Sequence, residues 1–356
     1  MHVGLVFWLG IAFGISGIGA VSTIAYKMSI NWILEIFMQC VALVIVFSSI
    51  SHFKKLHHFW VVIYCVMAIF TLKNAPSGPG DFTSDANDAC LALGMGIPFA
   101  FYALFQKNLS NKRRFFYCAA LALLFLGIIA TSSRGGFLGM LAGLLAIWWM
   151  TQRRLKVAMF AVLGGLIAGG MFLSFIPQDY VEDMESMNDT EDSTRVERLR
   201  TWEISWEMFK DNPLLGVGAG NFPNTVHLYQ HKTSWWTGRE KSLSGRQSHS
   251  LYFQVLPDLG LTGISIYFYI MCVLPLKLLR LTKRFDVDDP EQLPIKLFCQ
   301  ALIAAMAVYA VAGMFISVAY YPHVPIWLAM YTITICVIKK TCGEAFLQGD
   351  KGNTER

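Results

Sequence analysis

Residues 251–276 read LYFQVLPDLGLTGISIYFYIMCVLPL and contain one charged side chain, that of Asp258. A helix of about 20 apolar residues is long enough to cross the hydrocarbon core of a bilayer. The whole chain of 356 residues has the same character, since 55% of its residues are hydrophobic and 15% are charged. Soluble domains have about 25% charged residues. The sequence therefore predicts an all-α, polytopic membrane protein.

Ten stretches of the chain share this apolar character, and we see no internal repeat among them. We expect one membrane domain over residues 1–356, built as a membrane helical bundle of about ten spans. The candidate spans are residues 3–24, 31–50, 58–73, 88–106, 115–131, 135–150, 155–176, 251–276, 295–318 and 322–338.

Lys and Arg residues mark alternate connections between these spans. By the positive-inside rule the connections rich in Lys and Arg face the cytoplasm. Both termini are then cytoplasmic, and one large loop, residues 177–250 between spans seven and eight, lies outside. The net charge of +5 is spread over several inner connections, so we expect no binding to nucleic acid. The Lys- and Arg-rich connections are residues 54–55, 107–114, 153–156, 277–296 and 339–340, which alternate with short connections that carry only Lys27, Lys73 and Arg134.

The outer loop contains a predicted amphipathic helix. Thr194 and Glu197 have the spacing of a capping box, and Asn212-Pro213 ends the helix. Acidic residues 178–192 precede it, and glycine-rich residues 213–250, predicted to be irregular, follow it. A helical face that carries Trp and Arg suits a membrane interface. At about 100° per residue, this face holds Arg195, Arg198, Trp202, Trp206 and Phe209, whereas Arg200 points away and is expected to be solvated.

His249 is the first candidate for chemistry. It lies between Ser248 and Ser250, where the outer loop re-enters the membrane. A histidine with a pKa near 6.5 can accept a proton at ambient pH. The alternative is a structural histidine at a helix start, bonded to a nearby carbonyl.

Three arginines are candidates for binding an anion. Arg198 and Arg195 share the face of the predicted outer helix, and Arg134 lies in a tight outer turn between two spans. A guanidinium group stays charged in a low dielectric and matches the geometry of phosphate. The alternatives are an ion pair with Glu or a lipid phosphate for Arg198, and snorkelling to the surface for Arg134.

A second outer loop, residues 78–88, supplies carboxylates and amides, among them Asp81 and Asn87. These side chains are candidates for glycan or acceptor contacts, or they form a helix cap and a turn. His227 and His231 are four residues apart, but no His-Glu-x-x-His pattern accompanies them. We therefore expect no metal site.

Several of these pieces, taken in order, resemble the O-antigen ligase and O-antigen polymerase superfamily of bacterial membrane proteins. They are Ser133-Arg134-Gly135 between two spans, Arg198 four residues before Trp202, Asn212-Pro213-Leu214-Leu215-Gly216, and His249-Ser250-Leu251-Tyr252. The loop around Asp81 and Asn87 resembles most closely the O-glycosylation ligase subgroup. The family commonly has about twelve spans, and an even difference from ten preserves the topology. Asp258 stands where the family usually has a Glu, and we assign it no catalytic role.

The resemblance implies a glycosyltransferase in the bacterial inner membrane, with the outer loop in the periplasm. Such an enzyme takes a glycan from undecaprenyl pyrophosphate and joins it to a hydroxyl group of a lipid A core, a glycan or a protein, in the biosynthesis of lipopolysaccharide or another cell-envelope polysaccharide. It uses no nucleotide, metal ion or other cofactor. The resemblance also implies roles for single residues. Arg134 and Arg198 would bind the pyrophosphate, with Arg195 as a further candidate, and His249 would act as the base or orient the acceptor. Contacts to the glycan or acceptor would come from Asp81, Asn87 and Trp202.

Two other classes of function remain as alternatives. A transporter or flippase of lipid-linked sugars predicts paired charges inside several spans and two similar halves. The spans here are almost free of charge, with Glu35 as the exception. A non-catalytic assembly protein is the other alternative, and the difference in span number is its main support.

Overall fold

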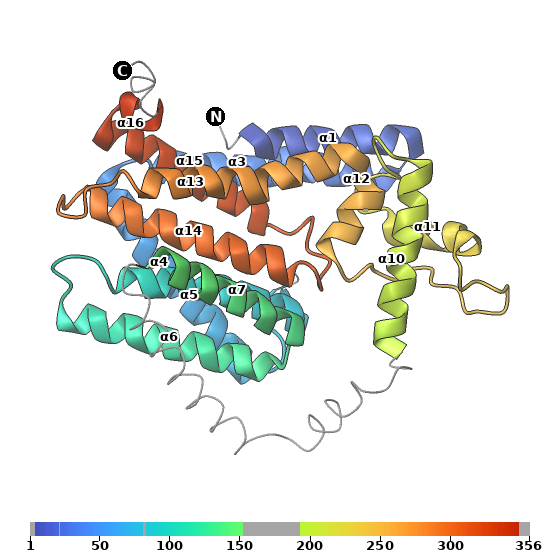
Figure 1. The fold of residues 1–356 in the computed structure, drawn as a ribbon, viewed down its shortest axis with the longest axis horizontal. Helices are drawn as coiled ribbons and strands as arrows, with labels where there is room; N and C mark the ends of the chain where they lie inside the picture. The colour runs from blue at the N-terminus through green and yellow to red at the C-terminus, as the bar shows by residue number, and fades with distance from the viewer. Residues whose placement is uncertain (1–3, 21, 81–82, 152–192, 349–356) are drawn as a thin grey trace.

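The structure is a computed structural model that describes residues 4–20, 22–80, 83–151 and 193–348 (Figure 1). Every regular element in this part of the chain is a helix, which confirms the predicted all-α class. Three predictions lie outside the described residues: the span at 155–176, the acidic segment 178–192 and the role of Asp81.

The helices follow most of the predicted spans. Up to residue 151 they are α1 (Gly4–Ala20), α2 (Thr23–Asn31), the π-helix η1 (Trp32–Ile36), α3 (Phe37–Phe47), α4 (Ile50–Lys73), α5 (Ala86–Ala103), α6 (Asn111–Thr131) and α7 (Arg134–Met150). From residue 193 onward they are α10 (Ser193–Asp211), α11 (Phe222–Tyr229), the 3-10 helix η4 (Gln230–Lys232), α12 (Leu251–Phe268), the π-helix η5 (Tyr269–Val273), α13 (Leu274–Thr282), α14 (Gln292–Ala312), α15 (His323–Cys342) and α16 (Glu344–Gln348).

Six helical stretches in the described part of the chain are long and apolar enough to cross a membrane. The chain therefore has the make-up of a multi-pass membrane protein, as predicted, whereas the count of ten spans stays a prediction. Two further apolar helices, α1 and α7, are shorter. The six stretches are Thr23–Phe47, Ile50–Lys73, Asn111–Thr131, Leu251–Thr282, Gln292–Ala312 and His323–Cys342.

The predicted outer helix is present as α10, and its bounds agree with the sequence signals to within a residue or two. It runs across the long helices at one end of the bundle, together with α11 (Figure 1). We call this end the α10 end. The presence of α11 and η4 corrects the prediction that residues 213–250 are irregular throughout.

The contact between α7 and α14 is close because glycines line it. A Cβ atom built at Gly139 would lie 2.7 Å from the Cβ atom of Ala312. One built at Gly135 would lie 2.8 Å from the Cβ atom of Phe315, just after α14 ends. Gly143 faces α14 in the same way. Stripes of small residues let membrane helices approach each other closely, and here they hold the start of α7 against the end of α14.

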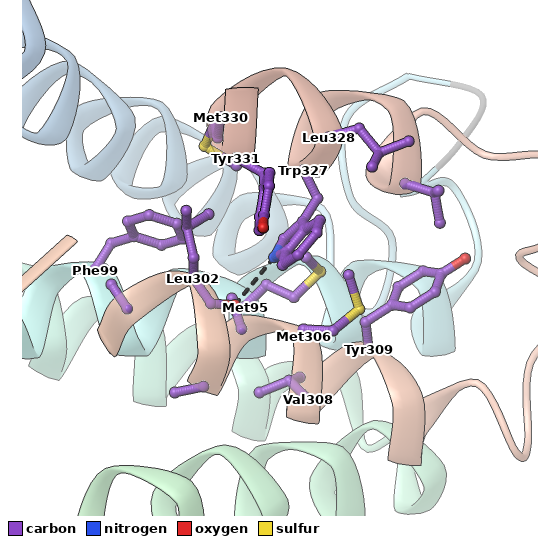
Figure 2. Close-up of a cluster of buried hydrophobic side chains, with 14 of the residues drawn as sticks. Met95, Phe99, Leu302, Met306, Val308, Tyr309, Trp327, Leu328, Met330 and Tyr331 are labelled. Atoms are coloured by element: carbon purple, nitrogen blue, oxygen red, sulfur yellow. Dashed lines mark hydrogen bonds between the residues drawn. The ribbon is translucent and has the colours of Figure 1, made fainter. Parts of the chain in front are cut away.

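The interior of the bundle is centred on α14, which packs against α5, α7, α13 and α15. Figure 2 shows the contact with α15, where the fully buried Trp327 lies among Met306, Tyr331 and other apolar side chains. Its ring N–H donates to the carbonyl oxygen of Leu302, 3.0 Å away. A buried indole needs such a partner for its N–H group, so this hydrogen bond fixes α15 against α14.

The helix α12 carries a break that the predicted span 251–276 does not anticipate. Gly260 has φ of +60° and ψ of −153°, far from helical values. The next N–H group, that of Leu261, donates to the carbonyl oxygen of Pro213 at 2.8 Å. Irregular backbone at membrane depth is tolerated where protein groups satisfy it. The predicted span 251–276 thus lies within a helical stretch long enough to cross a membrane, with a break at Gly260.

The partner of this break is the segment between α10 and α11, residues 213–221, which we call the glycine loop. Gly216, Gly218 and Gly220 have φ of +72°, +106° and +68°, conformations that glycine adopts without steric cost. A Cβ atom at Gly216 would also collide with the backbone of Asp258. The three glycines thus let the loop lie directly on the broken helix.

Asp258 fastens the glycine loop to α12. Its side chain is 0% exposed. One oxygen, Oδ2, accepts hydrogen bonds from the Gly220 N–H (3.0 Å) and the Tyr320 hydroxyl (2.8 Å). The other, Oδ1, accepts from the Phe222 N–H at 2.9 Å. A buried carboxylate is costly unless its oxygens are hydrogen-bonded, and here both are.

Replacing Asp258 with Ala should destabilise the protein strongly. Two N–H groups and one hydroxyl would lose their acceptor, and each unpaired buried group costs about 1–3 kcal/mol. We expect a Tm in detergent far below that of wild type. The matched control is Asp286→Ala, which removes an exposed carboxylate. Equal Tm values for the two variants would contradict the anchoring role.

Candidate active site

Three short segments meet at the α10 end. They are the turn between α6 and α7, the residues just before α12, and residues 313–322 between α14 and α15, which we call the 313–322 loop. The Oγ atoms of Ser248 and Ser317 lie 3.2 Å apart, and the Leu251 N–H donates to the Gly313 carbonyl oxygen at 2.7 Å. These contacts place His249 beside the 313–322 loop.

His249 has a backbone conformation that is unusual for its residue type. Its φ is +50°, in the left-handed region that only a few per cent of non-glycine residues occupy. Its neighbours fix it there. Ser248 and Ser250 are buried, and the Ser248 hydroxyl donates to the Ser250 carbonyl oxygen at 3.0 Å. Strained residues of this kind gather at functional sites.

The surroundings keep the His249 ring neutral near pH 7. Burial and then the Arg198 charge lower its pKa from 6.5, while Glu197 and Asp85 act in the opposite direction. The ring forms no hydrogen bond to any of the described residues. A neutral imidazole can accept a proton from a bound hydroxyl group.

Arg198 lies on α10 next to His249. Its Nε atom is buried and has no hydrogen-bond partner in the described chain. The carboxylate nearest in sequence, Glu197, pairs instead with Arg246 at 3.3 Å. The alternative of an ion pair between Arg198 and Glu197 is therefore not formed. A guanidinium group held this way is suited to a charged ligand, because a buried donor without a partner is costly.

Arg134 is the first residue of α7, and the tight turn predicted before it is confirmed, with Ser132 at φ +53°. The cap residue Ser133 accepts from the Gly136 N–H at 3.1 Å and donates to Asn87 Oδ1 at 2.7 Å. Arg134 therefore lies at the N-terminus of α7, where the helix dipole favours binding of an anion.

Asn87 and Asp85 join this turn to the start of α5. Asp85 caps α5 and accepts from the Asn87 N–H at 2.8 Å and from its Nδ2 at 2.9 Å. Both ends of the Asn87 amide are thus engaged, since its oxygen accepts from Ser133. Asp85 is therefore the cap of α5, and the contact of Asn87 with the glycan or acceptor stays a prediction.

Trp202 lies against the segment that carries His249. Its ring stacks on Phe253, with centroids 4.8 Å apart and planes at 9°, and its N–H donates to the Ser248 carbonyl oxygen at 2.9 Å. We therefore see Trp202 supporting the backbone at 248–250. Arg195 is exposed at the start of α10, and no contact ties it to His249.

The face of α10 that the sequence predicts to be apolar is not the buried face. Trp206 is 50% exposed, and the arginine expected in solvent, Arg200, stacks over the Trp235 ring at 4.7 Å. Small side chains allow the closest contact with α12, where the Ser205 hydroxyl donates to the Phe253 carbonyl oxygen at 2.9 Å. The buried residues are Thr201, Ile204, Ser205 and Met208.

The comparison with known families can be made at this point. Residues 119–268 match the family model described as O-Antigen ligase. Over these residues the chain is similar to the O-antigen ligase family. The matched residues contain Arg134, Arg198 and His249, so the three candidates lie within the region of similarity. No curated protein matches the chain.

Sequence reasoning missed most of the 313–322 loop, because the predicted span 295–318 places its residues 313–318 in a helix, whereas α14 ends at Ala312. Gly313 and Pro322 were the only local signals for a break. His227 and His231 do not share a helix, since α11 ends at Tyr229. In the described part of the chain, no three His, Cys, Asp or Glu side chains are grouped to hold a metal ion.

The pKa of His249 should move in opposite directions in two variants. Asp85→Asn removes a nearby negative charge and keeps the cap, because Asn caps as well as Asp, so the pKa should fall. Arg246→Gln removes a positive charge and frees Glu197 from its ion pair, so the pKa should rise. The pH dependence of acylation of His249 by diethyl pyrocarbonate, followed by mass spectrometry, reports both. If the pKa of His249 shifted in the same direction in both variants, the placement of Asp85 and Arg246 near its ring would be contradicted.

Proposed function

We propose that this protein is a glycosyltransferase that moves a glycan from undecaprenyl pyrophosphate to an acceptor hydroxyl group. The observation that carries the proposal is the pairing of a neutral histidine with an arginine. His249 has a lowered pKa and an unusual backbone conformation, and Arg198 beside it has a buried Nε atom without a partner in the described chain. The similarity of residues 119–268 to the O-antigen ligase family supports the same chemistry.

The proposed reaction is a single displacement at the first carbon of the transferred sugar. The acceptor oxygen attacks this carbon and its proton passes to His249, which acts as general base. The bond from the same carbon to the phosphate oxygen breaks, and the electron pair leaves with undecaprenyl pyrophosphate. Arg198 and Arg134 bind the pyrophosphate and stabilise the charge that develops on it. Guanidinium groups suit this role because they stay charged and bind phosphate oxygens in pairs.

The proposed reaction needs neither a metal ion nor a nucleotide, because the two arginines supply the positive charge. We assign Arg195 no direct contact, since it is exposed. Trp202 acts on the site by holding the backbone at Ser248, 2.9 Å from its N–H. The acceptor is a lipid A core, a growing glycan or a protein, and all three offer a hydroxyl group to the same base.

We also propose that the α10 end faces the periplasm from the inner membrane, with both chain termini in the cytoplasm. The arrangement of basic connections supports this orientation. The connections around Lys107 and Asp288 meet at the end of the bundle away from α10, where the Lys107 ammonium group donates to the Asp288 carbonyl oxygen at 3.0 Å (Figure 1). Connections rich in Lys and Arg lie on the cytoplasmic side of membrane proteins.

His249→Asn should abolish glycan transfer while the protein still inserts and folds. Asn is the matched replacement because it tolerates a positive φ, so the loss would reflect chemistry rather than backbone strain. The test is rescue of a host strain deleted for the gene, with lipopolysaccharide, secreted polysaccharide and glycoprotein examined in parallel. Wild type should restore one of the three and so identify the acceptor. Rescue by His249→Asn would remove His249 from the mechanism and favour a transport or assembly role.

Arg198→Lys should weaken use of the donor. Lysine keeps the charge but cannot form two parallel hydrogen bonds to phosphate, and we expect kcat/KM for the donor to fall by about tenfold to a hundredfold, as for the loss of one or two charge-assisted hydrogen bonds of ~1.5–3 kcal/mol. Arg200→Lys, on the same helix but stacked on Trp235, is the control. Unchanged kcat/KM in Arg198→Lys would place phosphate binding elsewhere.

A further inference from the structure

Glu35 is an ionisable residue in an apolar span, and the proposed function gives it no role. It lies in the middle of Thr23–Phe47, a span of 25 residues. Its side chain is exposed and forms neither a hydrogen bond nor an ion pair with any residue that the structure describes. An ionisable side chain at the centre of a bilayer is costly unless it finds a partner. The position of Glu35 therefore indicates a partner other than the described residues.

Glu35 belongs to a row of four polar side chains that follow each other at intervals of four residues. All four side chains are exposed, and none of them is bonded to a described residue. Residues four apart lie on the same side of a helix, and exposed apolar side chains such as Leu34 and Met38 flank the row. We call it the polar stripe: Lys27, Asn31, Glu35 and Gln39.

The π-helix η1 helps to keep the polar stripe on one face. In an α-helix of 3.6 residues per turn, positions four residues apart drift around the axis by about 40° at each step. The π-helix, Trp32–Ile36, has the wider turn of an i→i+5 hydrogen-bond pattern, in which four residues fall short of a full turn. The drift between Asn31 and Gln39 is therefore partly offset. Short π-helical segments of this kind are rare and occur frequently at functional sites.

The other side of the same span is packed against the bundle. The Ser29 hydroxyl donates to the Gly10 carbonyl oxygen on α1 at 2.5 Å, and the Cys40 thiol donates to the Pro325 carbonyl oxygen on α15 at 3.4 Å. Interhelical contacts of the described helices thus use the side of the span away from the stripe. The apolar centre of this span is only 11% buried, against 72% in the span Gln292–Ala312. The polar stripe therefore lies on the uncovered side of a peripheral helix.

We propose that the polar stripe is the contact surface for a second copy of this chain. Two copies in one membrane are inserted in the same direction, so a twofold axis between them runs along the membrane normal and brings equal residues to equal depth. Asn31 and Gln39 of one copy then face the same residues of the other, and an amide group both donates and accepts hydrogen bonds. A carboxyl group that holds its proton does the same, so two Glu35 side chains with one proton between them form a pair.

The depth of Glu35 favours this partner within a pair of copies. A group at the middle of the bilayer meets only groups at the same depth. In the six described stretches that can cross a membrane, Lys and Arg residues lie close to the ends, and the carboxyl group of Asp258 is already bonded on both oxygens. Glu35 of the second copy is therefore the ionisable group best placed to meet Glu35. Polar side chains that hydrogen-bond across helices stabilise their association in membranes.

Self-association is measured by energy transfer between donor- and acceptor-labelled copies of the full chain in liposomes, as the protein-to-lipid ratio is lowered. Wild type should associate reversibly. Glu35→Leu should weaken the association by about threefold to thirtyfold, the range for interhelical hydrogen bonds in membranes. Glu35→Gln, the matched variant, keeps a donor and an acceptor and should associate like wild type. Wild type that stays monomeric at every ratio overturns the proposal and favours a different membrane protein with a cation at the depth of Glu35.

Glu35→Lys tests whether Glu35 faces its own counterpart. Two copies of this variant place like charges opposite each other and should stay monomeric. A mixture of the variant with wild type places Lys opposite Glu at the same depth, so energy transfer between the two should return. A mixture that associates no better than Glu35→Lys alone would contradict the symmetric arrangement.

Two controls separate the stripe from the rest of the surface. Leu126→Ala changes an exposed apolar side chain on α6 and should leave the association unchanged. The Tm of Glu35→Leu in detergent should equal that of wild type, because the side chain has no partner among the described residues. A lower Tm together with a monomeric wild type would mean that another part of the same chain covers the stripe, which overturns the proposal. None of these measurements uses glycan transfer, so their outcome is independent of the proposed function.

Discussion

The buried carboxylate of Asp258 is the constraint on which the α10 end depends. A buried carboxyl group is tolerable only with hydrogen-bond partners around it, and the broken backbone of α12 at Gly260 likewise needs partners from outside the helix. The glycine loop meets both needs, with N–H groups for the carboxylate and the Pro213 carbonyl oxygen for the break. The broken helix α12 is in this way joined to the glycine loop, which lies about 40 residues earlier in the chain.

This joint determines where the candidate catalytic groups lie. The glycine loop follows α10 directly, so fastening the loop to α12 also positions α10 across the end of the bundle (Figure 1). Trp202 and Ser205 then bond to the first residues of α12 and to the segment before it. Arg198 lies on the same helix, one turn before Trp202, and is thereby placed next to His249. The site is therefore assembled from structural contacts that do not involve a ligand.

Local signals in the sequence were enough for the helical class, the bounds of α10 and the turn before Arg134. They also singled out His249 and Arg198 as candidates, because rare polar residues between apolar stretches are conspicuous, and the structure brings the two residues together while their roles stay predictions. The break at Gly260 could not be predicted from local signals, since the hydrogen bond that stabilises it comes from Pro213 in another element. The face of α10 that packs on the bundle could not be read from the helical pattern, because its contact with α12 is made by Ser205 and Trp202, of which only Trp202 belongs to the predicted face.

The glycine stripe on α7 has a mechanical consequence for the site. With Gly135 and Gly139 pressed against Phe315 and Ala312, α7 and the end of α14 leave no space to slide and behave as one body. Arg134 and the 313–322 loop are then held at a constant spacing. On the opposite side of the candidate site, α10 is held by hydrogen bonds to α12 rather than by glycine contacts, so the two sides resist displacement by different means.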